Sequence, residues 1–166
     1  MRLGDPATLT QIDELDGLAF ERFLEDLFAR LGYQAELTEH YDLGADLVVV
    51  RKGERVAVQA KRVSKWVGIS AVREVVGAKP IYACSGAMVV TNKWLSGPAR
   101  RLAEAHDVEL WDRRKLEQEI LRFCNVCEKR VTPRVREWCL ENSDRFGGRV
   151  YCIDHQRDLS GLLRSA

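Results

Sequence analysis

The chain has 166 residues, 26 basic against 25 acidic side chains, and a hydrophobic content of 46%. This composition excludes wholesale disorder, and the near-zero net charge argues against a protein that binds DNA through bulk positive charge. The sequence contains no apolar run of the ~20 residues needed to cross a bilayer and no signal-peptide pattern, so we expect a cytoplasmic protein without a membrane partner.

Apolar spacing and turn residues predict alternating helices and strands after a lead-in segment over residues 1–14. Asp16 is the expected N-cap of a first helix over Leu18–Leu31, which Gly32 ends. The elements expected next are strands at 33–38, 45–51 and 55–61, a helix at 70–78, a strand at 87–91, a helix at 97–106, a strand at 108–111 and a helix at 114–121. This alternation indicates an α/β fold with a central mixed sheet covered by helices on both faces.

The hairpin of the second and third expected strands brings together polar residues. If its tight turn pairs Val50 with Arg55, then Asp46 lies opposite Gln59, and both share a sheet face with Lys61. A slip of one residue would separate them. A carboxylate and an amide oxygen are ligands for Mg²⁺, and a lysine can orient a water or steady charge on a phosphate, so this face suits metal-assisted phosphodiester hydrolysis.

The same residues also permit simpler interpretations. Asp46 and Lys61 could be an ion pair at a strand edge. Glu21 lies at the border of the apolar stripe of the first helix, from which it could reach a metal held by Asp46 or could face solvent.

Six sequence segments, in order and spacing, resemble the Mrr-type branch of the PD-(D/E)XK restriction-endonuclease-like nucleases over about two thirds of the chain. They are F-E-R-F-L-E-D-L-F-A-R-L-G-Y, D-L-G-A-D-L-V-V, V-A-V-Q-A-K-R, A-V-R-E-V-V-G-A-K, M-V-V-T-N and V-E-L-W-D. The resemblance implies a restriction-endonuclease-like three-layer core at residues 15–121 and a Mg²⁺ (or Mn²⁺) site. It places Asp46, Gln59 and Lys61 at the motif positions, and Glu21 at the acid of the first helix.

Gln59 stands where most of the superfamily has an acid, although Q-x-K resembles the form of the Mrr branch. The amide removes one negative charge from the implied metal site. Glu21 and Asp46 then have to supply most of the attraction for the cation, with Gln59 as the third ligand.

Five further residues are candidate DNA contacts. Lys65 and Trp66 combine a cation with an aromatic ring, as loops that contact nucleic acid do. Thr91 and Asn92 end an apolar strand, and His40 lies in the turn before Asp46. A plain surface turn is the alternative for His40.

Cysteines cluster in the last part of the chain, which we expect to be a separate module over residues 122–166. Cys124 and Cys127 form one C-x2-C pair, and Cys152 and His155 form a C-x2-H pair after a 24-residue insert. Such pairs are typical of structural Zn²⁺ sites, and a short segment with little core needs a metal. Cys139 is the alternative fourth ligand to His155.

Charge also changes at this point. Through Ile120 there are 17 basic and 19 acidic residues, and from Leu121 onward 9 basic and 6 acidic. The basic balance permits contacts with a nucleic acid backbone, and a structural or protein-binding role is equally compatible with it. The tail R-F-G-G-R-V-Y-C-I-D-H-Q resembles zinc-finger-like extensions of bacterial nucleases of this type.

These observations favour a metal-dependent DNA endonuclease, in restriction or DNA processing, with a structural zinc module. The alternative is a non-cleaving DNA-binding or assembly module on a nuclease-derived fold, which the neutral Gln59 would suit. One active site cuts one strand, so a double-strand cutter would need a second event or a homodimer.

Overall fold

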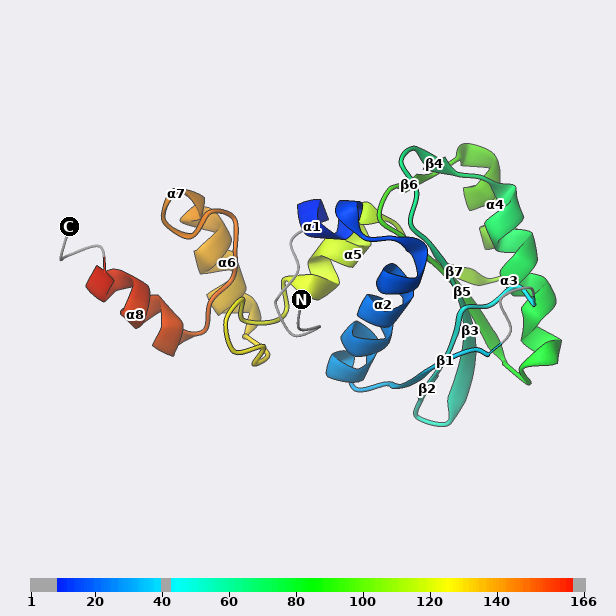
Figure 1. The fold of residues 1–166 in the computed structure, drawn as a ribbon, viewed down its shortest axis with the longest axis horizontal. Coiled ribbons are helices and arrows are strands. Elements are labelled where there is room, and N and C mark those ends of the chain that lie inside the picture. The colour runs from blue at the N-terminus through cyan, green and yellow to red at the C-terminus, as the bar shows by residue number, and fades with distance from the viewer. Residues whose placement is uncertain (1–8, 40–42, 163–166) are drawn as a thin grey trace. The chain divides into compact units, whose positions relative to one another are not determined.

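The computed structural model describes residues 9–39 and 43–162 (Figure 1). The chain divides into two compact units, with the division between Leu116 and Glu117. Within the described residues, no helix is long and apolar enough to span a membrane.

A five-stranded sheet in the order β1-β2-β3-β5-β7 forms the centre of the first unit. Its strands are β1 (Gln34–Leu37), β2 (Leu47–Arg51), β3 (Glu54–Lys61), β5 (Gly86–Thr91) and β7 (Val108–Trp111). The first three strands are antiparallel neighbours, whereas β3, β5 and β7 run parallel. The mixed sheet predicted from the sequence is therefore confirmed.

Helices cover both faces of this sheet (Figure 1). Helix α2 (Gly17–Leu31) packs on one face, and α3 (Ile69–Ile81) and α4 (Gly97–Ala105) pack together on the other. The parallel strands alternate with α3 and α4 along the chain because a crossover between parallel neighbours needs a connection of this length. The three-layer α/β architecture agrees with the expectation.

Helix α2 begins and ends where its sequence predicts. The Asp16 carboxylate accepts a hydrogen bond from the Ala19 backbone N–H at 2.8 Å, which satisfies a donor at the helix start. Gly32 ends the helix with φ +91°, a backbone conformation that side chains disfavour. The apolar stripe between these ends is buried. Its members are Phe20, Phe23, Leu24, Leu27, Phe28 and Leu31.

Two very short strands form a second sheet that the sequence pattern does not predict. They are β4 (Trp66–Val67) and β6 (Trp94–Leu95), which pair in parallel. Two residues are too few to display the alternation by which strands are recognised, so only the tertiary structure reveals this pairing.

The expected lead-in contains a short helix, α1 (Leu9–Glu14). Ile12 is fully buried, and the Asp13 carboxylate accepts hydrogen bonds from Asn92 Nδ2 and Lys93 Nζ, both at 2.7 Å, and from Arg113 Nη1 at 2.9 Å. The sequence did not predict this helix or its attachment to the rest of the first unit. The partners of Asp13 lie 79 to 100 residues away in the chain, beyond the reach of local pattern.

Helix α5 (Arg113–Ile120) leads into the second unit. That unit contains α6 (Pro133–Glu141), α7 (Ser143–Phe146) and α8 (Ile153–Leu162). Its small core consists of Cys139, Phe146, Val150 and Tyr151, with Leu121, Val131 and Val135 packed against it. A core of this size supplies little stability by itself.

We predict that Asp13→Ala lowers the free energy of unfolding by about 1–3 kcal/mol at neutral pH, because three donors lose an ionised acceptor. Burial raises the pKa of Asp13, but hydrogen bonds from Lys93, Asn92 and Arg113 outweigh it and hold the pKa below its usual 3.8. The ionised carboxylate therefore stabilises the fold at neutral pH, and this stabilisation is lost as the pH falls through the depressed pKa.

Urea unfolding of the wild type, Asp13→Ala and Asp13→Asn across this range measures the effect. The wild type and Asp13→Ala should converge in acid. A difference that does not change with pH would contradict the ionic role of Asp13.

Candidate functional site

The register of β2 and β3 builds the centre of the site. The structure pairs Val50 with Arg55 and Leu47 with Val58, as predicted. The Asp46 backbone N–H donates to the Val58 carbonyl at 2.8 Å, so Asp46 is still bonded to β3 just before the start of β2. Asp46 therefore lies beside the end of the third strand that carries Gln59 and Ala60.

The Asp46 carboxylate is fixed by two donors from β3. Its Oδ2 accepts hydrogen bonds from the Gln59 side-chain amide and from the Ala60 backbone N–H, the latter at 2.7 Å. Gln59 is only 3% exposed. The amide nitrogen of Gln59 thus faces Asp46, and Gln59 positions this carboxylate. The amide oxygen of Gln59 is not used in this contact.

Lys61 lies on the same strand face as Gln59 and forms an ion pair that the sequence did not suggest. Its Nζ lies 2.9 Å from Oε2 of Glu74 on α3. Glu74 belongs to the segment A-V-R-E-V-V-G-A-K, but no local signal marks it as a partner of Lys61. The pairing holds the ammonium group beside the Asp46–Gln59 pair.

Gly44 allows the segment before Asp46 to approach α3 closely. A Cβ at this position would lie 2.4 Å from the Glu74 carbonyl oxygen, and the residue has φ +81°. Both the contact and the backbone conformation require glycine. The approach brings the start of β2 against the turn of α3 that carries the partner of Lys61.

Glu21 contributes to the same electrostatic field from α2. Its pKa is raised, first by burial and then by the negative charge of Asp46, while Lys61 partly offsets both. The pKa of Asp46 is also raised by burial and by the charge of Glu74, against the hydrogen bond from Ala60 and the charge of Lys61. Two half-buried carboxylates that repel each other form a donor set that suits a divalent cation.

The five candidate DNA contacts have different locations. Lys65 and Trp66 are exposed. Thr91 and Asn92 are fully buried, and the Asn92 amide is bonded to the Val63 backbone and to Asp13. Neither is available to a DNA backbone in this structure, and Asn92 instead connects α1 to the sheet. His40 lies outside the described residues.

Trp94, which the sequence did not single out, is the strand partner of Trp66. The two residues are paired in register between β4 and β6, with exposed fractions of 66% for Trp66 and 40% for Trp94. A lone tryptophan after a strand carries no signal of its own, so the pairing depends on the tertiary structure.

The second unit gathers four metal-binding side chains. The ligand atoms of Cys124, Cys127, Cys152 and His155 all lie within 4.8 Å of one another. Sγ of Cys127 is 3.8 Å from Sγ of Cys152, and Sγ of Cys124 is 3.5 Å from Nδ1 of His155. Sulfur atoms bound tetrahedrally at about 2.3 Å from Zn²⁺ are separated by about 3.8 Å, so the donor set and its spacing fit this ion.

Backbone donors around the cluster favour a thiolate at Cys124. Burial raises the pKa of this thiol, but hydrogen bonds from the backbone of Cys127, Cys152 and Val126 outweigh it and lower the pKa to about 6. A thiolate is the form that binds metal.

Cys139 lies apart from this cluster. It is fully buried in the core of the second unit, where its sulfur accepts hydrogen bonds from the Tyr151 backbone N–H at 3.5 Å and from Gln156 Nε2 at 3.3 Å. The structure thus brings together the set with His155, and Cys139 packs in the core.

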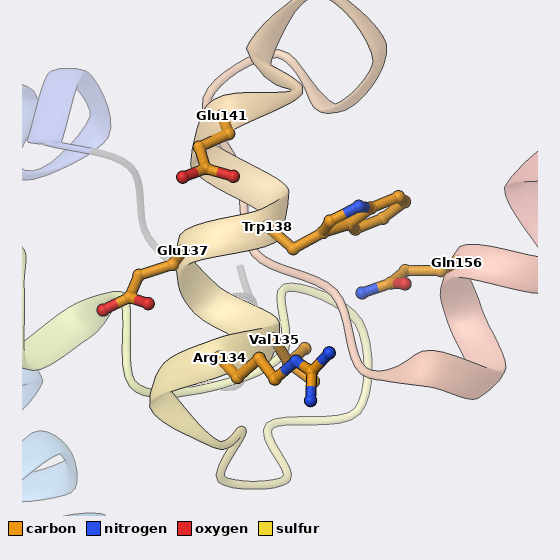
Figure 2. Close-up of a pocket in the computed structure, with 6 residues that line it drawn as sticks. All are labelled: Arg134, Val135, Glu137, Trp138, Glu141 and Gln156. Carbon is orange, nitrogen blue, oxygen red and sulfur yellow. The ribbon is translucent and has the colours of Figure 1, made fainter.

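Two cavities lie on the second unit. The larger, about 310 Å³, lies along α6 beside Gln156 of α8 (Figure 2). Figure 2 shows Trp138 and Gln156 extending over the same space, while Glu137 and Glu141 extend elsewhere from α6. The smaller, about 140 Å³, is lined by Arg122, Arg130 and Arg136 with Val131 and Pro133.

Comparison with solved structures supports the fold. The chain resembles the crystal structure of a protein of unknown function, AF1548, with a TM-score of 0.50, 15% identity, and coverage of 81% of this chain and 79% of that one. It also resembles the DNA modification-dependent restriction endonuclease AspBHI, with a TM-score of 0.50 and 19% identity. That match covers 82% of this chain but 40% of AspBHI.

Comparison with curated proteins gives no significant match. The family model Mrr_cat, described as a restriction endonuclease, matches residues 12–120. This range contains the whole sheet, α2, and the Asp46–Gln59–Lys61 face. The chain therefore belongs to the Mrr-type restriction endonuclease family.

Proposed function

We propose that this protein is a divalent-metal-dependent endonuclease that hydrolyses phosphodiester bonds of DNA. The observation that carries the proposal is the fixed register of β2 and β3, which sets the Asp46 carboxylate beside Gln59 and Lys61 in a chain of the restriction endonuclease family. The charge coupling of Glu21 to Asp46 adds a second acid from another element.

Glu21 and Asp46 would hold Mg²⁺ or Mn²⁺, and the Gln59 amide oxygen would be the third ligand. A bound cation supplies Lewis-acid stabilisation of a phosphate and lowers the pKa of a water molecule. Gln59 and the Ala60 N–H orient Asp46, whose Oδ2 they occupy, so that Oδ1 is the oxygen left for a cation. Lys61 would orient the attacking water, and Glu74 would hold Lys61 in place.

A second candidate is a DNA-binding or assembly module that no longer cuts. It is favoured by the neutral Gln59 and by the pairing of Lys61 with Glu74, which occupies the lysine when no substrate is bound. DNA binding that needs no divalent cation and survives Asp46→Ala would favour this candidate, and metal-stimulated turnover would exclude it.

Plasmid cleavage with Mg²⁺ or Mn²⁺ tests the first proposal. Asp46→Ala, Lys61→Ala and Glu21→Ala should each reduce the rate by about 100-fold or more, because each removes a charge acting on the reacting phosphate or its cation. Glu25→Ala is the matched control, since Glu25 is one turn further along α2 and should leave the rate unchanged.

Metal binding provides a readout that is independent of cleavage. Mg²⁺ should raise the melting temperature of the wild type and of Glu25→Ala, and should have little effect on Asp46→Ala. Equal cleavage by the wild type and all four variants would refute the assignment, because the activity would then belong to a contaminant.

We further propose that Cys124, Cys127, Cys152 and His155 bind a structural Zn²⁺. Elemental analysis of natively purified protein should find about one zinc per chain. Cys124→Ser, Cys152→Ser and His155→Ala should lose the zinc and melt at lower temperature, because the small core depends on the metal. Cys139→Ser is the discriminating control and should keep its zinc, since this thiol packs in the core. A zinc-free wild type would refute the site.

The arginine-lined cavity supports a DNA-backbone role for the zinc module. Arg130 and Arg136 are two of its three arginines, while the guanidinium of the third, Arg122, pairs with Glu119. A cavity with guanidinium groups and no lining carboxylate suits a phosphate group.

Salt-dependent DNA binding measures this contribution. Arg130→Ala with Arg136→Ala should make the slope of log affinity against log salt concentration shallower by about one or two, according to how many phosphates these side chains contact. Arg134→Ala with Arg157→Ala removes the same charge from α6 and α8 outside this cavity and should have a smaller effect. If both pairs of substitutions had an equal effect, the module would contribute to DNA binding only through its overall positive charge, and not through this cavity.

A further inference from the structure

Trp66 and Trp94, which we call the tryptophan pair, occupy one face of the small β4–β6 sheet. Residues paired in register on parallel strands point to the same side, and neighbouring strands lie about 4.8 Å apart. The next residues, Val67 and Leu95, point the other way and are 4% and 2% exposed. The sheet is therefore buried on one side and presents two indole rings to solvent on the other.

This small sheet is anchored to the protein core. Val67 and Leu95 pack in the hydrophobic cluster formed with α3 and α4. The Ser96 backbone N–H donates to the Val67 carbonyl at 2.9 Å, and the Ser96 hydroxyl caps α4. The Arg113 N–H donates to the Lys93 carbonyl at 2.8 Å. These contacts therefore hold the backbone of the tryptophan pair in place.

The two tryptophans are the exposed aromatic side chains of this small sheet. Within the described residues, neither indole makes an aromatic or cation–π contact, and the two rings do not stack on each other. Trp111 provides the contrast, because it is 3% exposed and packs against Phe28. Two adjacent, partly exposed tryptophans form an apolar surface of the kind that marks interaction sites.

Each tryptophan lies a few residues after a strand of the candidate site. Lys61 at the end of β3 is paired with Thr91 at the end of β5. Trp66 follows Lys61 by five residues, and Trp94 follows Thr91 by three. Lys65, next to Trp66, is exposed. An aromatic surface with a neighbouring cation therefore adjoins the edge that carries the Asp46–Gln59–Lys61 face.

We propose that the tryptophan pair is a stacking platform for unpaired nucleobases of the DNA substrate. Every base has a π face that can stack on an indole, while the nearby lysine suits the backbone phosphate. Base faces are hidden within an intact duplex, so the platform can act only on single-stranded, bulged or extruded bases. The inference rests on the proposed function and narrows its substrate to DNA that carries unpaired bases beside the cleaved bond.

Binding of fluorescent oligonucleotides tests the platform without cleavage. The parent is Asp46→Ala in buffer without Mg²⁺, and the probes are a single strand, a perfect duplex and a duplex with a bulge. The parent should bind the single strand and the bulge more tightly than the duplex. Leucine at both tryptophan positions should weaken the first two by on the order of tenfold to a hundredfold and leave the duplex nearly unchanged.

Variants of matched hydrophobicity separate base stacking from a general apolar contact. Trp66→Phe with Trp94→Phe should retain much of the affinity, whereas Trp66→Leu with Trp94→Leu should not, because leucine preserves an apolar surface but cannot stack. Trp138→Leu, an exposed tryptophan on α6, is the control and should bind as the parent does. Circular dichroism and melting confirm that each variant is folded.

Several results would overturn the platform. They are unchanged binding of all three probes by the double leucine variant, an equal loss for all three, or a change of oligomeric state in light scattering with no change in oligonucleotide affinity. The last would assign the tryptophans to a contact between copies of the chain. Plasmid cleavage is scored separately, so failure of the nuclease proposal and failure of the platform remain distinguishable.

Discussion

The candidate site depends on the register between β2 and β3. The Asp46 N–H donates to the Val58 carbonyl of β3. The Asp46 carboxylate accepts hydrogen bonds from the next two residues of that strand, Gln59 and Ala60. Side chains alternate between faces, so a slip of one residue would turn Asp46 away from Gln59 and Lys61. Consecutive residues of both strands are buried, so β2 and β3 pack against both helical layers in this register. The stability of the sheet and the chemistry of its edge therefore depend on the same pairing.

Acidic groups are brought to that edge from both helical layers. Glu21 comes from α2 on one side, and Glu74 comes from α3 on the other, held close by the approach of Gly44. Burial is the main cause of the raised pKa of Glu21 and of Asp46. The charge of Asp46 adds to the first and the charge of Glu74 to the second, and Lys61 offsets only part of this. In the proposed function, a divalent cation bound by Glu21 and Asp46 would favour their ionised forms. Under that proposal, these two carboxylates supply the attraction for the cation that the neutral Gln59 does not.

The second unit differs from the first in having only a small apolar core. Its core of four buried residues is small for a segment of its length, and four clustered side chains that could hold a metal ion belong to the same unit. The hairpin that carries Cys124 and Cys127 also carries Arg122 and Arg130, because the Cys124 N–H bonds to the Lys129 carbonyl and the Val131 N–H to the Arg122 carbonyl. The segment that holds the ligands therefore also orients basic side chains.

The sequence by itself determined the features whose signals are local. The capped amphipathic helix α2, the hairpin turn that pairs Val50 with Arg55, and the close cysteine and histidine pairs are each encoded within a few residues. Only the tertiary structure decided the long-range partners, which include the attachment of α1, the Lys61–Glu74 pair and the register of β4 with β6. Burial and the hydrogen bond to Asp13 likewise give Asn92 a structural contact that its sequence position does not indicate. Such pairings follow from how the layers pack, for which a single sequence carries no local pattern.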